Sequence, residues 1–363
     1  MTPSATSSAP AAGTSPRIGF AAQVDHTGVE VDAGPPSSSG LRAGTELFTA
    51  AERLGYDVGY VRTRHLQDAL SSPLLFLAAL GQSVQRMQLG TAVIPLRFEN
   101  PGRLAEDLAT ADLLLGGRLR AGLGSGYSAH DAMYVEAYGQ MRGERGEHVD
   151  RVLHELLALL DGQIVSTADA HVEGVEPGTP LRVQPQVPGL RSRLAYGAAG
   201  AERAAMAGSA GLGLQLATMV PDDGSGRSFE SLQLDVVEAY REASRAAGYG
   251  EGHVMVSRQM IPVTGDAELE RYVSLIPRER AAAPGVSGEH RSLEIGGHEA
   301  VYSQIVLDDP SVVAQALIAD PVVQAADEIV LVLPFSADRT DQLRVLESFA
   351  RDVVPHLLAA IVT

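Results

Sequence analysis

The sequence contains no cysteine and no tryptophan, and aromatic residues make up only 5% of its 363 positions. The lack of cysteine excludes disulfide bonds, thiolate metal sites, iron–sulfur clusters and a cysteine nucleophile. The chain also has no apolar run of 18 residues, so no membrane-spanning helix is expected. A chain without disulfides is compatible with the cytoplasm, and we expect the protein to function there.

Positive charge is scarce as well. Lysine and arginine total 28 against 45 acidic residues, which gives a net charge of −17. This excess argues against a nucleic-acid or anionic-membrane surface, although a local site can still bind a small acid. The ten histidines show no HExxH motif and no spacing typical of a metal site, so no metal is expected. His148 and His154 are expected to be solvent-exposed on one helix.

The chain alternates between strand and helix signals along almost its whole length. Residues 1–16 lack the features of a signal peptide and are expected to form a disordered tail. From 17 to 363, eight strand–helix pairs follow in strict order, which predicts a single (β/α)8 barrel domain in the TIM-barrel class. A doubly wound open sheet is the alternative. The strands are expected at 17–24, 57–62, 87–96, 118–123, 194–197, 212–220, 254–263 and 328–333.

Two long segments interrupt this alternation and are expected to be insertions after strands four and seven. Residues 161–192 are rich in proline and glycine and carry no long periodic segment, so they are predicted to leave the core. Residues 265–308 are long and irregular, which makes them a candidate lid.

The stretch 87–126 is the most informative part of the sequence. It reads as a strand, a helix ended by Gly116-Gly117 and a second strand that ends in GSG, which is the size of a parallel β-α-β crossover. Leu104, Leu108, Ala111 and Leu115 form one buried helical stripe. Polar and glycine residues follow both strands, and parallel α/β proteins place their chemistry at that end.

His65 and two arginines follow the second strand in the string VRTRHL. The imidazole is either a general base or cofactor contact, or a structural histidine bonded to a loop carbonyl. Arg62 and Arg64 have the planar fork that holds an anion. For Arg62 a surface salt bridge is the preferred interpretation.

Two glycine-containing turns are further candidates for a binding site. YGAAGAER (196–203) opens a helix whose free N–H groups favour an anion, but it is neither a P-loop nor GxGxxG. GLGSGY (122–127) offers close backbone approach or simply a tight turn. Its Ser125 lacks the GxSxG spacing of a nucleophile elbow.

In combination these segments resemble the luciferase-like monooxygenases. The matching strings are AERLGYDVGYVRTRH (51–65), SSPLLFLAALGQSVQRMQLGTAVIPL (71–96), ENPGRLAEDLATADLLLGGRLRAGLGSGY (99–127) and RGERGEHVDRVLHELL (142–157). Weaker matches lie at 183–200 and 327–335. The resemblance covers roughly residues 17–358.

The resemblance implies a barrel mouth that binds a flavin, either FMN or the deazaflavin F420. Many members of this family use reduced FMN from a separate reductase, together with O2, to oxygenate a small organic substrate. A non-proline cis peptide and bulge in the third strand often support the ring, and these map to Ala92-Val93. His65 and Arg64 are then the candidate catalytic residues. The candidate cofactor-binding residues are Ala92, Val93, Asn100, Ser125, Tyr127, Gly197, Gly200 and Arg203.

The chain departs from the family pattern in three places. Arg64 replaces the first of two adjacent histidines, and Ser125 stands where some members have an arginine. Gly200 and Arg203 occupy positions where many members use serine or threonine hydroxyls toward the flavin phosphate. Arg203 either replaces the hydroxyl with a charge-assisted contact, or the phosphate is held weakly.

The first interpretation is therefore a flavin-dependent monooxygenase that acts on a small molecule. A flavin reductase is its expected partner protein, and a homodimer is its expected oligomeric state. The runner-up is an F420-dependent reductase or dehydrogenase on the same fold. A catalytically silent flavin-binding homologue is the alternative from another class, because the phosphate region is altered.

Overall fold

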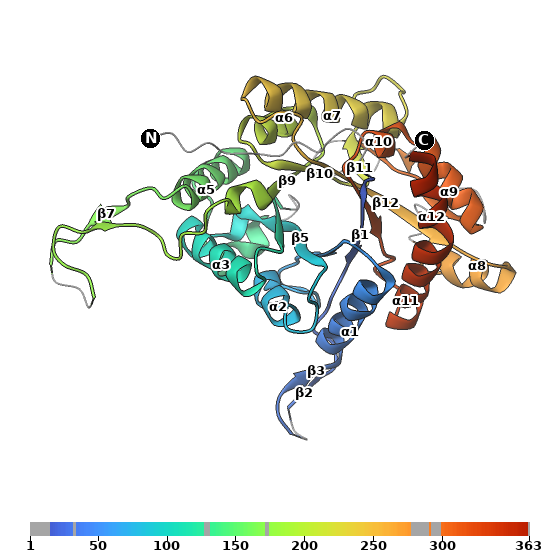
Figure 1. The fold of residues 1–363 in the computed structure, drawn as a ribbon, viewed down its shortest axis with the longest axis horizontal. Coiled ribbons are helices and arrows are strands. Elements are labelled where there is room, and N and C mark those ends of the chain that lie inside the picture. The colour runs from blue at the N-terminus through green and yellow to red at the C-terminus, as the bar shows by residue number, and fades with distance from the viewer. Residues whose placement is uncertain are drawn as a thin grey trace.

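The computed structural model describes residues 15–31, 34–126, 131–170, 174–276, 290–291 and 299–361. Eight parallel strands of this part of the chain close into a ring, and helices surround it on the outside (Figure 1). The expected (β/α)8 barrel is thereby confirmed and the open sheet is excluded. In ring order the strands are β1 (Arg17–Ala22), β4 (Val58–Val61), β5 (Gln88–Pro95), β6 (Leu119–Gly124), β9 (Leu194–Ala198), β10 (Gly213–Leu216), β12 (Val254–Pro262) and β16 (Glu328–Val332).

The register of the strands shows how the ring closes. β1 pairs in parallel with β16 through Phe20 and Leu331, and β10 pairs with β12 through Leu214 and Val254. The strands are almost continuously apolar because both of their faces are covered. The carboxyl ends of all eight strands therefore lie at one end of the barrel.

The surrounding helices follow the strands in the expected order. The start of helix α3 is fixed by its cap. The Asn100 side chain accepts a hydrogen bond from the Arg103 N–H at 3.0 Å, and Pro101 occupies the first turn. The predicted stripe of Leu104, Leu108, Ala111 and Leu115 is buried. The main helices are α1 (Ser39–Leu54), α2 (Pro73–Leu80), α3 (Pro101–Leu114), α5 (Arg145–Leu160), α6 (Ala201–Ser209), α7 (Phe229–Ala246), α9 (Pro310–Ala319), α11 (Arg339–Ser348) and α12 (Val354–Ile361).

Shorter elements occupy the connections. α11 continues into α12 through a π-helical turn at Phe349–Val353, so the expected single final helix is interrupted once. The strand predicted at 212–220 is also divided, because its second half turns away from the ring to pair with β14. The short elements are β2 (Val29–Glu30), β3 (Ser37–Ser38), α4 (Val135–Tyr138), β7 (Ser166–Thr167), β8 (Pro180–Leu181), β11 (Met219–Pro221), α8 (Asp266–Val273), β13 (His290–Arg291), β14 (Ala300–Tyr302), β15 (Ile305–Asp308) and α10 (Pro321–Gln324).

Both expected insertions lie outside the ring. The segment between α5 and β9 carries the antiparallel pair β7–β8, and Figure 1 shows it extending away from the barrel. The segment 265–308 is less irregular than predicted, since it contains helix α8 and strand β15, which pairs in parallel with β12. Helix α8 is only eight residues long, which is too short to give a clear helical period in the sequence. The remainder, 277–289 and 292–298, lies outside the described residues, so the lid expectation stays a prediction.

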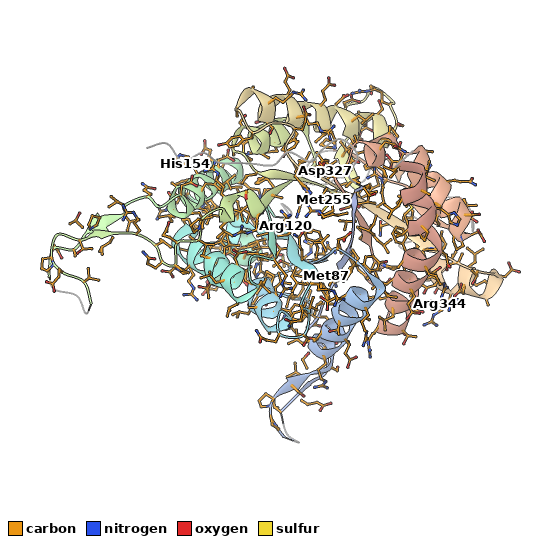
Figure 2. All side chains as sticks on the ribbon, in the orientation of Figure 1. Met87, Arg120, His154, Met255, Asp327 and Arg344 are labelled. Atoms are coloured by element: carbon orange, nitrogen blue, oxygen red, sulfur yellow. The ribbon has the colours of Figure 1, made fainter. Side chains whose placement is uncertain are left out.

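A buried polar cluster fills the amino-terminal end of the barrel interior. Glu328 is fully buried, accepts a hydrogen bond from Tyr60 Oη at 2.6 Å, and lies 3.4 Å from the Arg17 guanidinium. Arg17 and Arg120 both donate to the Gln88 side chain. Figure 2 shows Arg120 and Met255 within the ring of strands. The polar groups at this end therefore bond mainly to one another, although Glu328 Oε2 has no hydrogen-bond partner among the described residues, and the opposite end of the barrel is left for a ligand.

None of the described helices is long and apolar enough to cross a membrane. On the outer surface the expectation for His154 is confirmed, because it is exposed. The expectation for His148 is wrong. Its side chain is only 9% exposed and Nδ1 lies 2.9 Å from an Arg151 nitrogen. The six-residue spacing places the two histidines on different faces of α5, and the face of His148 packs against the barrel.

Candidate active site

A cavity of about 730 Å³ opens at the carboxyl ends of the barrel strands. This volume is in the range of small-molecule and cofactor sites. The structure brings most of the predicted residues together around it. The predicted residues in its lining are Arg64, His65, Ala92, Val93, Ser125, Gly197, Gly200 and Arg203. Tyr127 lies outside the described residues, and Asn100 caps helix α3 instead of lining the cavity.

The bulge in β5 forms one side of the cavity. The Ala92–Val93 peptide bond is cis, as the resemblance implied, and the register with β6 skips between Thr91 and Ile94. The Val93 side chain fills the space beside two glycines. A Cβ added to Gly124 or Gly197 would lie 2.8 Å from a Val93 methyl carbon. Glycine at these two positions therefore lets β6 and β9 pack against the bulge, with bare backbone facing the cavity.

His65 follows β4 and is nearly buried, with 9% of its surface exposed. Its Nδ1 lies 3.1 Å from the Tyr138 hydroxyl, and its ring makes edge contacts with Phe98 and Tyr138. Nε2 has no hydrogen-bond partner among the described residues. Burial lowers the pKa of His65 below its usual 6.5, so the imidazole is neutral at pH 7. A neutral ring with one oriented nitrogen and one unpartnered nitrogen can accept or donate a proton.

An aromatic cluster behind His65 was missed by the sequence reasoning. Phe98 and Tyr134 line the cavity, and Tyr138 contacts both rings at centroid distances of 4.9 and 6.4 Å. The two tyrosines are four residues apart, which is the only signal the sequence offered. Burial, followed by the neighbouring Asp107, raises the pKa of Glu99 to about 7. Burial, followed by the charge of Glu99, likewise raises the pKa of Tyr138. The hydroxyl that orients His65 is thus protonated at neutral pH.

The start of helix α6 forms the other end of the cavity. Gly200 is its N-cap and has no side chain to satisfy the free N–H groups of the first turn. Arg203, in that turn, forms an ion pair with Asp150 of α5. On the facing loop the Ser125 carbonyl accepts a hydrogen bond from Arg145 at 3.2 Å. Helix N–H groups and a guanidinium together provide an anion site, which Asp150 partly neutralises.

Buried polar atoms without partners gather in this cavity. Most buried polar atoms in proteins are hydrogen-bonded, so each exception needs an explanation. The Tyr196 hydroxyl belongs to a side chain that is 1% exposed, and burial raises its pKa. The Gln215 amide donates to the Thr91 carbonyl at 3.2 Å and leaves its oxygen unpaired. The unpartnered cavity atoms within the described ranges are Thr63 Oγ1, His65 Nε2, Tyr196 Oη, Gln215 Oε1 and Gln259 Oε1.

The preferred prediction for Arg62, a surface salt bridge, is wrong. Over the described chain it forms no surface salt bridge; its guanidinium stacks 4.6 Å from the centroid of the Phe335 ring and lies 3.4 Å from Gln23 Oε1. Its side chain lines the cavity instead. It points inward because the loops after β1 and β16 supply the amide and the ring there. Sequence alone does not reveal that these two loops meet.

Comparison with known proteins agrees with this architecture. The model of a family described as luciferase-like monooxygenase matches residues 24–329. An F420-dependent glucose-6-phosphate dehydrogenase from Mycolicibacterium gilvum is 28% identical over 344 residues, which cover 86% of this chain and 93% of that protein. Limonene 1,2-monooxygenase from Rhodococcus erythropolis is 32% identical over 115 residues, or 31% of this chain and 30% of that protein. The solved structure of monooxygenase RslO1 from Streptomyces bottropensis has a TM-score of 0.64 at 18% identity, covering 94% and 99% of the two chains.

Proposed function

This chain belongs to the luciferase-like monooxygenase family, and we propose that it is a flavin-dependent monooxygenase that uses reduced FMN and O2 to oxygenate a small organic substrate. FMN in this proposal is a loosely held cofactor that a separate flavin reductase supplies. We also propose that the protein forms a homodimer, as the resemblance implies. The relatives are oxidoreductases of two kinds, oxygenases and F420-dependent dehydrogenases.

The observation that carries this proposal is the set of unpartnered polar atoms in the barrel mouth. The edge of a flavin ring presents alternating hydrogen-bond donors and acceptors, and a flat ring requires close backbone on one side. The Tyr196 hydroxyl and the Gln215 amide oxygen offer partners for such an edge. Gly124 and Gly197 leave bare backbone beside the bulge. Residues and ligand therefore fit each other.

The phosphate of FMN fits the opposite end of the cavity. The first turn of α6 offers free N–H groups, and Arg203 adds a positive charge. We expect Ser125 to contribute its hydroxyl from the facing loop, since that side chain also lines the cavity. The partial neutralisation of Arg203 by Asp150 matches a cofactor that binds and leaves as a substrate does.

Bound FMN supplies the electrons with which O2 is activated. The residues of this chain move a proton, stabilise charge and exclude water. His65 handles a proton at Nε2, while the hydroxyl of Tyr138 fixes the orientation of its ring through Nδ1. Arg64 lines the same region and stabilises negative charge that develops near the ring. Apolar side chains such as Ile261 and Ile305 exclude water from the reacting atoms.

An F420-dependent dehydrogenase is the second candidate, because a relative aligned over 86% of this chain is described as an F420-dependent glucose-6-phosphate dehydrogenase. The neutral His65 would suit the removal of a proton from an alcohol. F420, however, carries a tail with several carboxylates. Burial lowers the pKa of Arg203, but the hydrogen bond to Asp150 and the nearby negative charges of Asp150 and Glu202 raise it overall. These acids repel a polyanionic tail more than the single phosphate of FMN, which favours FMN.

Titration of the purified protein with oxidised FMN, reduced FMN and F420 tests the proposal. We expect saturable binding of reduced FMN and oxygen uptake that depends on the protein. F420 reduction without oxygen uptake would establish the second candidate. No binding of any of the three would leave a silent homologue.

The Arg203→Gln variant tests the proposed phosphate site. Loss of a charge-assisted contact is expected to weaken FMN binding about tenfold. Asp150→Asn is the matched control, and it should not weaken binding, because it frees the guanidinium. Unchanged FMN affinity in Arg203→Gln would reject this role.

A further inference from the structure

We propose that the substrate of this cavity is an organic acid whose carboxylate binds to Arg62. This inference rests on the proposed function, because it assigns the substrate class of the same cavity. Arg62 follows β4, whereas Arg203 opens the helix after β9, and strands β5 and β6 separate the two in the ring. The cavity therefore has two cationic ends, of which the phosphate of FMN needs only one.

The contacts of Arg62 leave its charge uncompensated. The flat face of the guanidinium stacks on the Phe335 ring, and a long hydrogen bond to the Gln23 amide holds one edge. Both partners are neutral. Other arginines near the barrel core are paired with acids, such as Arg97 with Asp131 and Arg258 with Asp320. Stacking preorganises a guanidinium while leaving its N–H fork available for a planar oxyanion.

The rest of the cavity lining agrees with a negatively charged substrate. Within the described residues it contains arginine and histidine but no aspartate or glutamate. The whole chain carries a net charge of −17, which repels an anion at long range. In such a protein, a lining without acids among the described residues leaves the arginine side chains as local partners for an anion.

The surroundings of Arg62 indicate a carboxylate on an apolar body. Val332, Pro334 and Phe335 line the cavity beside it, and Ile261 and Ile305 continue the apolar lining. One guanidinium fork matches the two oxygens and the single charge of a carboxylate. The apolar side chains match a hydrocarbon or aromatic remainder.

The test uses three probes of similar size on the full-length protein: benzoate, its neutral counterpart benzamide, and phenyl phosphate. Binding is measured by NMR titration, first without flavin and then with saturating FMN, which occupies the Arg203 end. We expect benzoate to bind more tightly than benzamide in both conditions. Arg62→Gln should weaken benzoate about tenfold or more while leaving benzamide and FMN unchanged.

Three further variants keep the inference falsifiable. Arg62→Lys should retain part of the benzoate preference, because it keeps the charge and loses the planar fork. Arg245→Gln removes an arginine from the exposed side of α7 and should change nothing. Melting curves of each variant establish that it is folded. Arg203→Gln should affect FMN and leave benzoate binding in the presence of FMN unchanged.

Equal affinities for benzoate and benzamide would overturn the inference, as would a benzoate affinity that depends on Arg203 and not on Arg62. Tighter binding of phenyl phosphate than of benzoate through Arg62 would replace the carboxylate with a phosphate and reject the stated class. If FMN fails to bind, the proposed function fails, whereas the flavin-free titration still reports on Arg62.

Discussion

His65 combines three properties that a proton-handling group needs. It is nearly buried, its Nδ1 faces the Tyr138 hydroxyl, and its Nε2 is unpartnered within the described structure. Burial of the ring keeps it neutral at pH 7 by lowering its pKa. The hydrogen bond of its Nδ1 is to the Tyr138 hydroxyl and not to the loop carbonyl of the alternative interpretation. The proton-handling role stays a prediction.

The His65→Asn variant is expected to lower kcat by about 10²- to 10⁴-fold, because general acid–base catalysis contributes that much. FMN binding should persist. Since the pKa lies below 6.5, the wild-type rate should hold down to mildly acidic pH and then fall as the imidazole takes up a proton. His154→Asn, on the exposed face of α5, is the control. An unchanged rate and pH profile for His65→Asn would contradict the assigned role.

Glu99 makes folding stability depend on pH. Its pKa is about 7 in the folded protein and near 4.5 in the unfolded chain, so the folded state favours the neutral carboxyl. Stability from this group is fully present below pH 4.5 and is lost as the pH rises through 7. Glu99→Gln cannot ionise, and we expect it to gain about 1–3 kcal/mol over the wild type at pH 8 and nothing at pH 4.

Urea unfolding at both pH values measures this difference. The Glu155→Gln variant removes an equal charge from the exposed surface of α5 and corrects for net charge. A gain for Glu99→Gln that is the same at pH 4 and pH 8 would contradict the assigned ionisation.

At the level of single elements, the bulge of β5 determines how β6 and β9 must be built. Val93 fills the space that a side chain at position 124 or 197 would need. The two glycines and the valine therefore form one packing unit beneath the proposed flavin site. The sequence suggested glycine for close approach of a ligand, and the structure adds the neighbouring side chain that excludes any larger residue.

Gly197→Ala is expected to destabilise the protein by about 1–3 kcal/mol and to weaken FMN binding, because the new methyl group meets Val93 at 2.8 Å. Adding Val93→Ala should recover part of the stability by making room. Gly102→Ala on α3 is the control; its nearest neighbour would be 3.4 Å away, and alanine favours a helix there. The first variant would count against this packing unit if it melted like the wild type.

The main elements were largely predictable, since the long helices bury a regular apolar stripe and the barrel strands are short apolar runs buried on both faces. The ring followed from the alternation of strands and helices, and most of the predicted site residues line the cavity. Contacts between distant loops were not predictable. The sequence around Arg62 is that of a surface residue, because the Phe335 ring on which it stacks lies more than 270 positions later. Asn100 has the sequence context of a site residue, yet its side chain serves the local helix cap.

For the molecule as a whole, closure of the ring depends on the first and last strands meeting. Their contact contains Glu328, which is fully buried and bonded to Tyr60 and near Arg17. Without the Glu328 carboxyl group, the Tyr60 hydroxyl would lose its acceptor and the Arg17 guanidinium would lose a nearby negative charge. The cluster therefore holds β1, β4 and β16 together beneath the cavity.

Glu328→Ala is expected to lower the free energy of unfolding by about 3–5 kcal/mol, because it removes the acceptor of the buried Tyr60 hydroxyl and the partner of the half-buried Arg17 guanidinium. Glu347→Ala on the exposed side of α11 should stay within about 0.5 kcal/mol of the wild type. Denaturant unfolding followed by circular dichroism gives both values. A loss below 1 kcal/mol for Glu328→Ala would show that the cluster contributes little to closure.

The most direct test of the proposed FMN site is a crystal structure of the protein, from crystals grown in the presence of FMN. We expect the ring system to lie in the barrel mouth beside the Ala92–Val93 bulge, with its polar edge toward Tyr196 and Gln215 and its phosphate at the start of α6. Clear density for FMN at any other place, or a barrel mouth that stays empty at saturating FMN, would contradict the account.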